Sequence, residues 1–145
     1  MTKKEWDSKE VLNASFFEQL YEKSLDAIVI IDNKNRILHI NKAFTNLFHF
    51  KLNEVIGEDI NTLIVPDKLI AESEEMSFNA SKSEIVRKDT KRKNKEGDEI
   101  WVSIMGLPII LENNKKGIFA VYSDISKVVS EREKSEEANR MKTAI

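Results

Sequence analysis

The sequence contains no cysteine among its 145 residues. This absence excludes disulfides, thiolate nucleophiles, thiolate metal ligands and chromophores attached through sulfur. It is typical of a protein in a reducing compartment. No apolar run approaches the roughly 20 residues that a membrane-spanning helix needs, and the opening MTKKEWDSKE lacks the apolar core of a signal peptide. We therefore expect a cytoplasmic chain, with a membrane-bound parent protein as the alternative.

Residues that could carry catalysis are also scarce. The four glycines stand singly at turn-like positions, so there is no Gly-rich phosphate loop and no nucleophile elbow. The ATP-site motifs of kinases are absent. The two histidines, His39 and His49, fall in a predicted strand and just after a predicted helix, where structural roles are more common than catalytic ones. We predict that the chain itself is not an enzyme.

The charge pattern gives little reason to expect a nucleic-acid partner. Net charge is −2, and 33% of the residues are charged against 41% hydrophobic, which is typical of one globular domain with appendages. Six of the nine residues in the run RKDTKRKNK, residues 87–95, are Lys or Arg. Acidic residues follow closely, and no aromatic residues are interleaved for base stacking. The run therefore favours a solvated hairpin whose charges block edge pairing.

Residues 25–46 contain the clearest secondary-structure signals in the chain. Two runs rich in Ile and Val, residues 27–31 and 37–40, flank the polar DNKNR, which predicts a β-hairpin. Asn41 then has the character of a helix N-cap. The apolar residues that follow at helical spacing predict a short helix: Ala43, Phe44, Leu47 and Phe48.

The remaining core elements follow from similar patterns. Two short helical turns are expected within residues 50–64, with Gly57 ending the first, and a longer helix over 67–78 after Pro66. Pro108 requires an edge or bulge position in its strand. Further strands are predicted over residues 84–93, 99–110 and 118–125. Five strands with helices inserted after the second indicate an α+β fold, with one antiparallel sheet covered on one face by short helices.

Helices are expected at both ends, which divides the chain into residues 1–23, 24–126 and 127–145. The first helix, residues 8–23, carries a wide apolar stripe that could pack on its own sheet, on a second subunit, or on both. The last helix has little apolar surface and is marginal alone. It is more typical of the start of a coiled coil that continues past Ile145. We therefore expect a homodimer held by both helices, with no membrane contact by this segment.

The order DAIVIID, turn, RILHINKAF and LNEVIG resembles the opening of a PAS domain. The later pieces NKEGD, IWV, LPI and YSDIS agree with that family in order and spacing. The resemblance covers residues 24–126 and implies the PAS fold. The final EEANRMKTAI is similar to the linker that enters the phosphoacceptor helix of a sensor histidine kinase. This likeness implies a covalently linked output domain beyond Ile145.

The resemblance also bears on cofactors. In flavin-binding LOV domains a photoreactive cysteine lies near the position of Ile60, so thiol-adduct flavin chemistry is excluded here. In oxygen-sensing haem PAS domains an axial histidine lies on the long helix, and residues 67–78 contain none. A haem would have to use His39 or His49, and we do not expect one. No cofactor is predicted, and non-covalent flavin or a small ligand stays open.

By resemblance to PAS domains that hold ligands, an apolar pocket is expected between sheet and helices. Tyr122 would offer one hydroxyl, and Arg92 a cation for an acidic ligand. The alternative is a fully packed core with no cavity. The expected lining residues are Val29, Ile31, Phe44, Phe48, Ile60, Leu63, Arg92, Val102, Ile104, Ala120 and Tyr122.

These features predict a regulatory module of a signalling protein, with a histidine kinase as the first hypothesis. A ligand, or a change in a partner domain, would alter the sheet. Asp124 and Ile125 would pass that change into the C-terminal helix pair, which is the bistable element that such a switch needs. Two alternatives are a constitutive dimerisation or docking module without a ligand, and the input domain of a diguanylate cyclase.

Overall fold

The structure is a computed structural model that describes residues 12–82 and 84–143. Five antiparallel strands form one sheet in the order β2-β1-β5-β4-β3, so the first and last strands are neighbours near its centre. The bounds are β1 Ala27–Asp32, β2 Ile37–Ile40, β3 Val86–Lys93, β4 Glu99–Ile110 and β5 Lys116–Asp124. The predicted five-stranded α+β architecture is confirmed, with ends of β1, β3 and β5 differing from the predicted ones by one or two residues.

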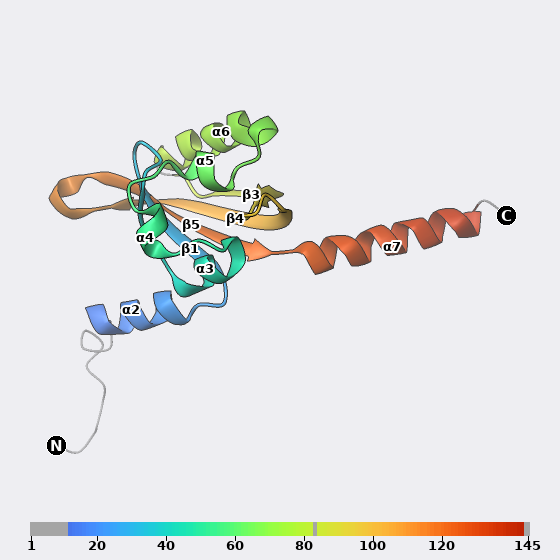
Figure 1. Cartoon of the computed structure of the whole chain (residues 1–145), viewed down its shortest axis with the longest axis horizontal. Helices are drawn as coiled ribbons and strands as arrows, with labels where there is room; N and C mark the ends of the chain where they lie inside the picture. Colours follow the sequence, from blue (N-terminus) through green and yellow to red (C-terminus); the bar gives the residue numbers. More distant parts are fainter. Residues whose placement is uncertain (1–11, 83, 144–145) are drawn as a thin grey trace, which may run out of the picture.

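Helices inserted between β2 and β3 cover one face of this sheet (Figure 1). The long helix α6 packs on β4 and β5, and α3 packs on β1. A 3-10 turn after Pro66 precedes α6, so the predicted helix 67–78 is split and ends three residues later than expected. The helix bounds are α3 Lys42–Phe48, α4 Leu52–Val55, α5 Ile60–Ile64, η1 Asp67–Leu69 and α6 Ile70–Ser81, while η2 Glu112–Asn114 lies between β4 and β5.

The N-terminal helix α2, Ala14–Lys23, begins later than predicted. Asn13 is its N-cap, and the Asn13 side chain accepts a 2.9 Å hydrogen bond from the backbone N–H of Phe16. The prediction that Leu12 and Asn13 are helical is therefore wrong, and the predicted start over residues 8–11 lies outside the described residues. A polar cap inside a continuing apolar stripe explains the error, because the stripe alone favours a longer helix.

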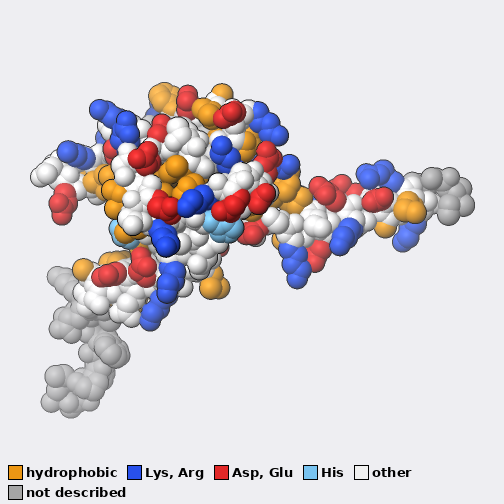
Figure 2. Space-filling view, in the orientation of Figure 1, with side chains coloured by type: hydrophobic (Ala, Val, Ile, Leu, Met, Phe, Trp, Pro, Cys, Tyr) orange, Lys and Arg blue, Asp and Glu red, His pale blue; other side chains and the backbone are white. Residues whose placement is uncertain are grey.

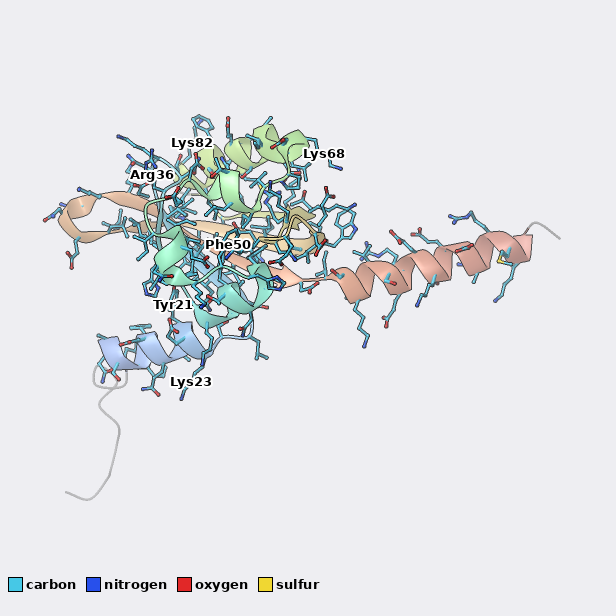
Figure 3. The ribbon with its side chains drawn as sticks, in the orientation of Figure 1. Tyr21, Lys23, Arg36, Phe50, Lys68 and Lys82 are labelled. Atoms are coloured by element: carbon cyan, nitrogen blue, oxygen red, sulfur yellow. The ribbon has the colours of Figure 1, made fainter. Side chains whose placement is uncertain are left out.

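Asn41 joins α2 to the sheet and to α3. Its side chain is buried and accepts hydrogen bonds from the N–H groups of Ile28 at 2.8 Å and Phe44 at 3.0 Å. Its amide nitrogen donates to the carbonyls of Tyr21 at 2.8 Å and Asp26 at 3.1 Å. Of these roles of Asn41, the sequence analysis predicted only the N-cap of α3. Figure 3 shows Tyr21 on the side of α2 that faces the domain and Lys23 on the outer side.

The predictions for Gly57 at a helix end and for Pro108 at a strand edge agree with the backbone. Gly57 has φ +81°, a left-handed conformation that glycine adopts without strain, directly after α4. Pro108 pairs with Ile118 of β5, while the pairing of β3 with β4 ends at Gly106. The missing N–H of Pro108 therefore falls on an unpaired side of β4, as its edge prediction requires.

The last helix, α7 Ser126–Thr143, extends away from the domain (Figure 1). From Ser126 to Lys142 every residue except Val129 is exposed. Figure 2 shows acidic and basic side chains interspersed along it, with few hydrophobic ones. The predicted C-terminal helix is thus present and has almost no contact with the rest of the described chain.

Candidate functional site

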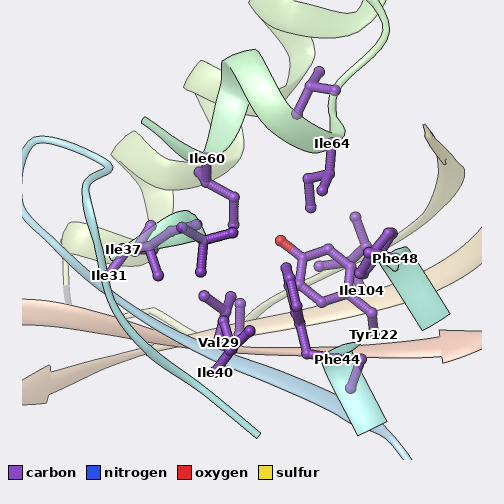
Figure 4. Close-up of a cluster of buried hydrophobic side chains, with 14 of the residues drawn as sticks. Val29, Ile31, Ile37, Ile40, Phe44, Phe48, Ile60, Ile64, Ile104 and Tyr122 are labelled. Carbon is purple, nitrogen blue, oxygen red and sulfur yellow. The ribbon is translucent and has the colours of Figure 1, made fainter. Parts of the chain in front are cut away.

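Three aromatic rings fill much of the space between sheet and helices. The ring centroids of Phe44 and Phe48 are 4.7 Å apart, and those of Phe48 and Tyr122 are 5.3 Å apart. Figure 4 shows this ring cluster beside Val29 and Ile104, with the Tyr122 hydroxyl pointing away from the strands. A small cavity of about 40 Å³ lies between α6 and the sheet, beside Tyr122; it is partly open to solvent, and we call it the interior cavity.

Four of the eleven predicted lining residues line this cavity. They are Arg92, Ile104, Ala120 and Tyr122. The other walls come from α6, β3, β4 and β5, and comprise Ser73, Met76, Ser77, Ala80, Val86, Gly106 and Ile118. Six other predicted residues are buried in the core cluster without lining the cavity: Val29, Ile31, Phe44, Phe48, Ile60 and Val102. Leu63 is partly buried against that cluster.

Arg92 is the most deeply buried charge in the described chain, with 2% of its surface exposed. Its Nη1 donates to Glu72 Oε1 at 3.1 Å and to the carbonyl of Lys91 at 2.8 Å. Thr90 Oγ1 donates to Glu72 Oε2 at 2.8 Å, and Lys88 Nζ lies 3.9 Å from the same oxygen. Because strand residues alternate, Lys88, Thr90 and Arg92 share the face that meets α6.

Glu72 and Thr90 were missed by the sequence analysis. The alternation of polar side chains at positions 88, 90 and 92 was the available signal, since it places a threonine and two cations on the buried face. Another buried polar pair supports α6, because Ser73 Oγ donates to Asn61 Oδ1 at 2.7 Å. The layer between β3 and α6 is therefore polar and hydrogen-bonded, whereas the layer under α3 is apolar.

Tyr122 is the other polar group of the cavity. Burial raises the pKa of its hydroxyl to about 12, against the smaller opposite effect of the Arg92 charge. The hydroxyl thus stays protonated at neutral pH and can donate a hydrogen bond. Tyr122 also lines a surface groove of about 250 Å³, together with Leu25 and Asp124.

Asp124 occupies the junction between β5 and α7. Its Oδ1 accepts a 2.9 Å hydrogen bond from the N–H of Ser126, the first residue of α7. The N–H of Ile125 donates to the carbonyl of Trp101 on β4 at 3.0 Å, and that of Val129 to Ile125 at 2.9 Å. Asp124 and Ile125 therefore hold the start of α7 to the sheet, and their role in signal relay stays a prediction.

Neither histidine lines the interior cavity. His39 Nδ1 and the Tyr21 hydroxyl form a 2.8 Å hydrogen bond on the α2 side of the sheet. His49 pairs with Glu96, and this hydrogen bond lowers the pKa of the Glu96 carboxyl. Within residues 12–82 and 84–143, no group of three or more His, Asp or Glu could hold a metal ion, and no described helix is long and apolar enough to cross a bilayer.

Comparison with known proteins gives consistent matches. The aerotaxis receptor of Escherichia coli (strain K12) is 28% identical over 90 residues, which are 62% of this chain and 18% of the receptor. The PAS domain of a Colwellia psychrerythraea protein superposes with TM-score 0.69 at 24% identity, covering 78% of this chain and 97% of that one. A domain of a sensory box sensor histidine kinase/response regulator from Geobacter sulfurreducens gives 0.63 at 18% identity, covering 79% and 99%.

The family comparison is the most direct. The profile of the PAS domain matches residues 25–127, which include every strand of the sheet and all the helices that cover it. The predicted resemblance is thereby confirmed over almost the same range as the sequence indicated. The chain belongs to the PAS domain family of sensory modules.

Proposed function

We propose that this PAS domain is the input module of a cytoplasmic signalling protein, with a sensor histidine kinase as the parent. In this proposal the occupancy of the interior cavity, or a change in a partner domain, alters β5. The change then passes through Asp124 and Ile125 into α7, and α7 passes it to an output domain beyond Ile145. The aerotaxis receptor and the Geobacter kinase, both signalling proteins by name, support this class of parent.

One observation supports the proposed relay from the cavity to α7. Tyr122 lines the interior cavity and also the surface groove that contains Asp124. The two residues are two positions apart on β5, so any displacement of the Tyr122 ring acts directly on the strand end that holds α7. Tight packing against Phe44 and Phe48 favours such transmission, because a close-packed core passes strain on rather than absorbing it.

The exposed helices support a dimer. An 18-residue helix without packing partners is marginal in water, so α7 requires a partner to be stably helical. Phe17 and Leu20 of α2 are each 55% exposed and border an apolar groove of about 400 Å³ formed with Ile28 and Phe119. A second subunit would cover these surfaces and pair the two α7 helices.

The small cavity favours a second candidate. With about 40 Å³ of interior space, the domain could serve as a constitutive dimerisation module that binds nothing. This candidate needs the same exposed helices but no relay through Asp124. The two candidates therefore differ in what a change at the junction should do.

The test compares Asp124→Ala with Asp124→Asn in the full-length parent. Asparagine retains a side-chain oxygen that can cap α7, whereas alanine removes it. We expect the alanine variant to have fixed output under inducing and non-inducing conditions, the asparagine variant to respond like the wild type, and both to fold. If the output of the alanine variant still responds to the inducing condition, the proposed relay through Asp124 is wrong. Sedimentation velocity tests the dimer, and a monomeric wild-type chain would contradict it.

A further inference from the structure

A carboxylate-binding arrangement is built between α6 and β3. Lys88, Thr90 and Arg92 stand at alternate positions on one face of β3, and all three reach the Glu72 side chain. The Glu72 carboxylate is therefore bound by one hydroxyl and two cationic side chains. Such a set matches the acceptor oxygens and the charge of any carboxylate, not only of this one.

Arg92 has donors left for a second acceptor. Its guanidinium carries five N–H groups, and both of its hydrogen bonds use Nη1. Nε and Nη2 make no hydrogen bond to residues 12–82 or 84–143. The Tyr122 hydroxyl, on a side chain with only 6% exposure, likewise has no hydrogen-bond partner in those ranges. Both side chains line the cavity, so these donors are available to a molecule bound in it.

We propose that this cavity binds a short-chain carboxylate anion, of the size of formate or acetate. The anion's oxygens would accept from Arg92 and from the Tyr122 hydroxyl, and its carbon end would lie against Ile104 and Ala120. The inference rests on the proposed sensory function and names the ligand class for it. A cavity of about 40 Å³ holds about three water-sized probes, which suits three or four heavy atoms.

A route to the cavity lies beside Glu72. A surface groove of about 270 Å³ runs between α6 and β3, and Glu72 and Lys88 line it. Met76 and Val86 line both this groove and the cavity, so the two spaces adjoin at these side chains. Met76 is unbranched and flexible, and its movement would admit a small anion.

Binding would also have a structural consequence. The ligand would share the Arg92 charge with Glu72 and so weaken the ion pair that holds α6 to β3. It would at the same time contact Tyr122, two residues before Asp124. A small anion would thus act on both the covering helix and the strand that leads to α7.

The test is a titration of the isotope-labelled chain followed by amide NMR. Sodium acetate is compared with acetamide, its neutral analogue, with sodium chloride added to keep ionic strength constant. We expect saturable shifts in α6, β3 and β5 with acetate, and binding at least about tenfold weaker with acetamide, since the charge-assisted hydrogen bonds are lost. Absence of saturable shifts with both formate and acetate, or equal binding of acetamide, would overturn the proposal.

Two variants locate the site without removing Arg92. Glu72→Gln removes the competing charge and keeps an acceptor, so acetate affinity should rise by about tenfold. If the Glu72–Arg92 pair is only structural, this variant loses stability and gains no affinity. In Gly106→Ala the new methyl would lie 3.3 Å from Val86 Cγ2 and 3.8 Å from Ala80 Cβ, where it narrows the cavity. Its acetate affinity should fall at least about tenfold.

Ser103→Ala is the matched control, because Ser103 lies on the same strand with its side chain on the opposite face. Unchanged acetate affinity in Gly106→Ala would contradict the placement of the anion in this cavity. An equal loss of acetate affinity in Ser103→Ala would contradict it as well. The titration needs only this chain and no output domain. A failure to bind acetate would therefore contradict the ligand proposal but not the proposed relay through Asp124. A negative result with the Asp124 variants would contradict the relay but not acetate binding.

Discussion

Raising the pH should destabilise this domain through Tyr122. In the folded chain, burial raises the pKa of the Tyr122 hydroxyl to about 12 from its ordinary value of 10.0, and the Arg92 charge opposes this only in part. In the unfolded chain the hydroxyl returns to its ordinary value. Below pH 10 both states keep the proton, so stability is unaffected. As pH rises from 10 to about 12, the unfolded state loses the proton first, and stability falls.

The size of the effect follows from the shift. One pKa unit corresponds to about 1.4 kcal/mol, so a shift of about two units removes about 2 kcal/mol by pH 12 and approaches roughly 3 kcal/mol above it. That is a large fraction of the 5–15 kcal/mol that typically stabilises a domain. Tyr122→Phe keeps the ring against Phe44 and Phe48 and removes the ionising group.

The assay is urea unfolding followed by circular dichroism at a series of alkaline pH values, together with tyrosinate absorbance. The chain has two tyrosines, and burial also raises the pKa of Tyr21, so Tyr21→Phe serves as a control for the second contribution. We expect the loss of stability above pH 10 to be smaller in Tyr122→Phe than in the wild type. Equal losses in both, or tyrosinate formation near pH 10 in the folded Tyr21→Phe variant, would refute the reasoning.

Two further substitutions test the packing that positions the site. Asn41→Ala should lower the free energy of unfolding by roughly 3 kcal/mol, because it strands the buried N–H groups of Ile28 and Phe44. A loss under about 1 kcal/mol in urea unfolding would contradict this assignment. Phe48→Ala should cost about 3–5 kcal/mol in urea unfolding, since its fully buried ring packs on Phe44 and Tyr122. A loss under about 1 kcal/mol would indicate that the core repacks around the missing ring.

Much of the fold was readable because its signals are local. The Ile and Val runs with a polar DNKNR between them determine β1 and β2, and the alternation in residues 99–110 determines β4. The start of α2 was not readable in this way. Asparagine at position 13 and aspartate at position 7 are both residue types that favour the N-cap, and the apolar stripe runs past Asn13, so the local pattern did not choose between them.

The candidate site was readable only in part, because cavity size depends on how side chains fill space. Alternation identified which strand residues face the helices, including Ala120 and Tyr122. It could not show that the Phe44, Phe48 and Tyr122 rings pack closely against one another, or that the cavity beside Tyr122 is only about 40 Å³. Glu72 was missed because its partner Arg92 is 20 residues away on another element, and an acidic residue on a helix is usually solvated.

The basic run on β3 shows how one strand can have two physical roles. β3 is an edge strand, and alternate positions such as Lys91 face away from α6, where Lys91 Nζ lies 3.7 Å from Glu99 and 5.1 Å from the Trp101 ring centre. These charges fit the expected protection of an exposed edge. The intervening positions, Thr90 and Arg92, are buried and hold Glu72 of α6. Edge protection requires only charge. The buried face also requires geometry, because Arg92 Nη1 lies 3.1 Å from Glu72 Oε1 and Thr90 Oγ1 lies 2.8 Å from Glu72 Oε2.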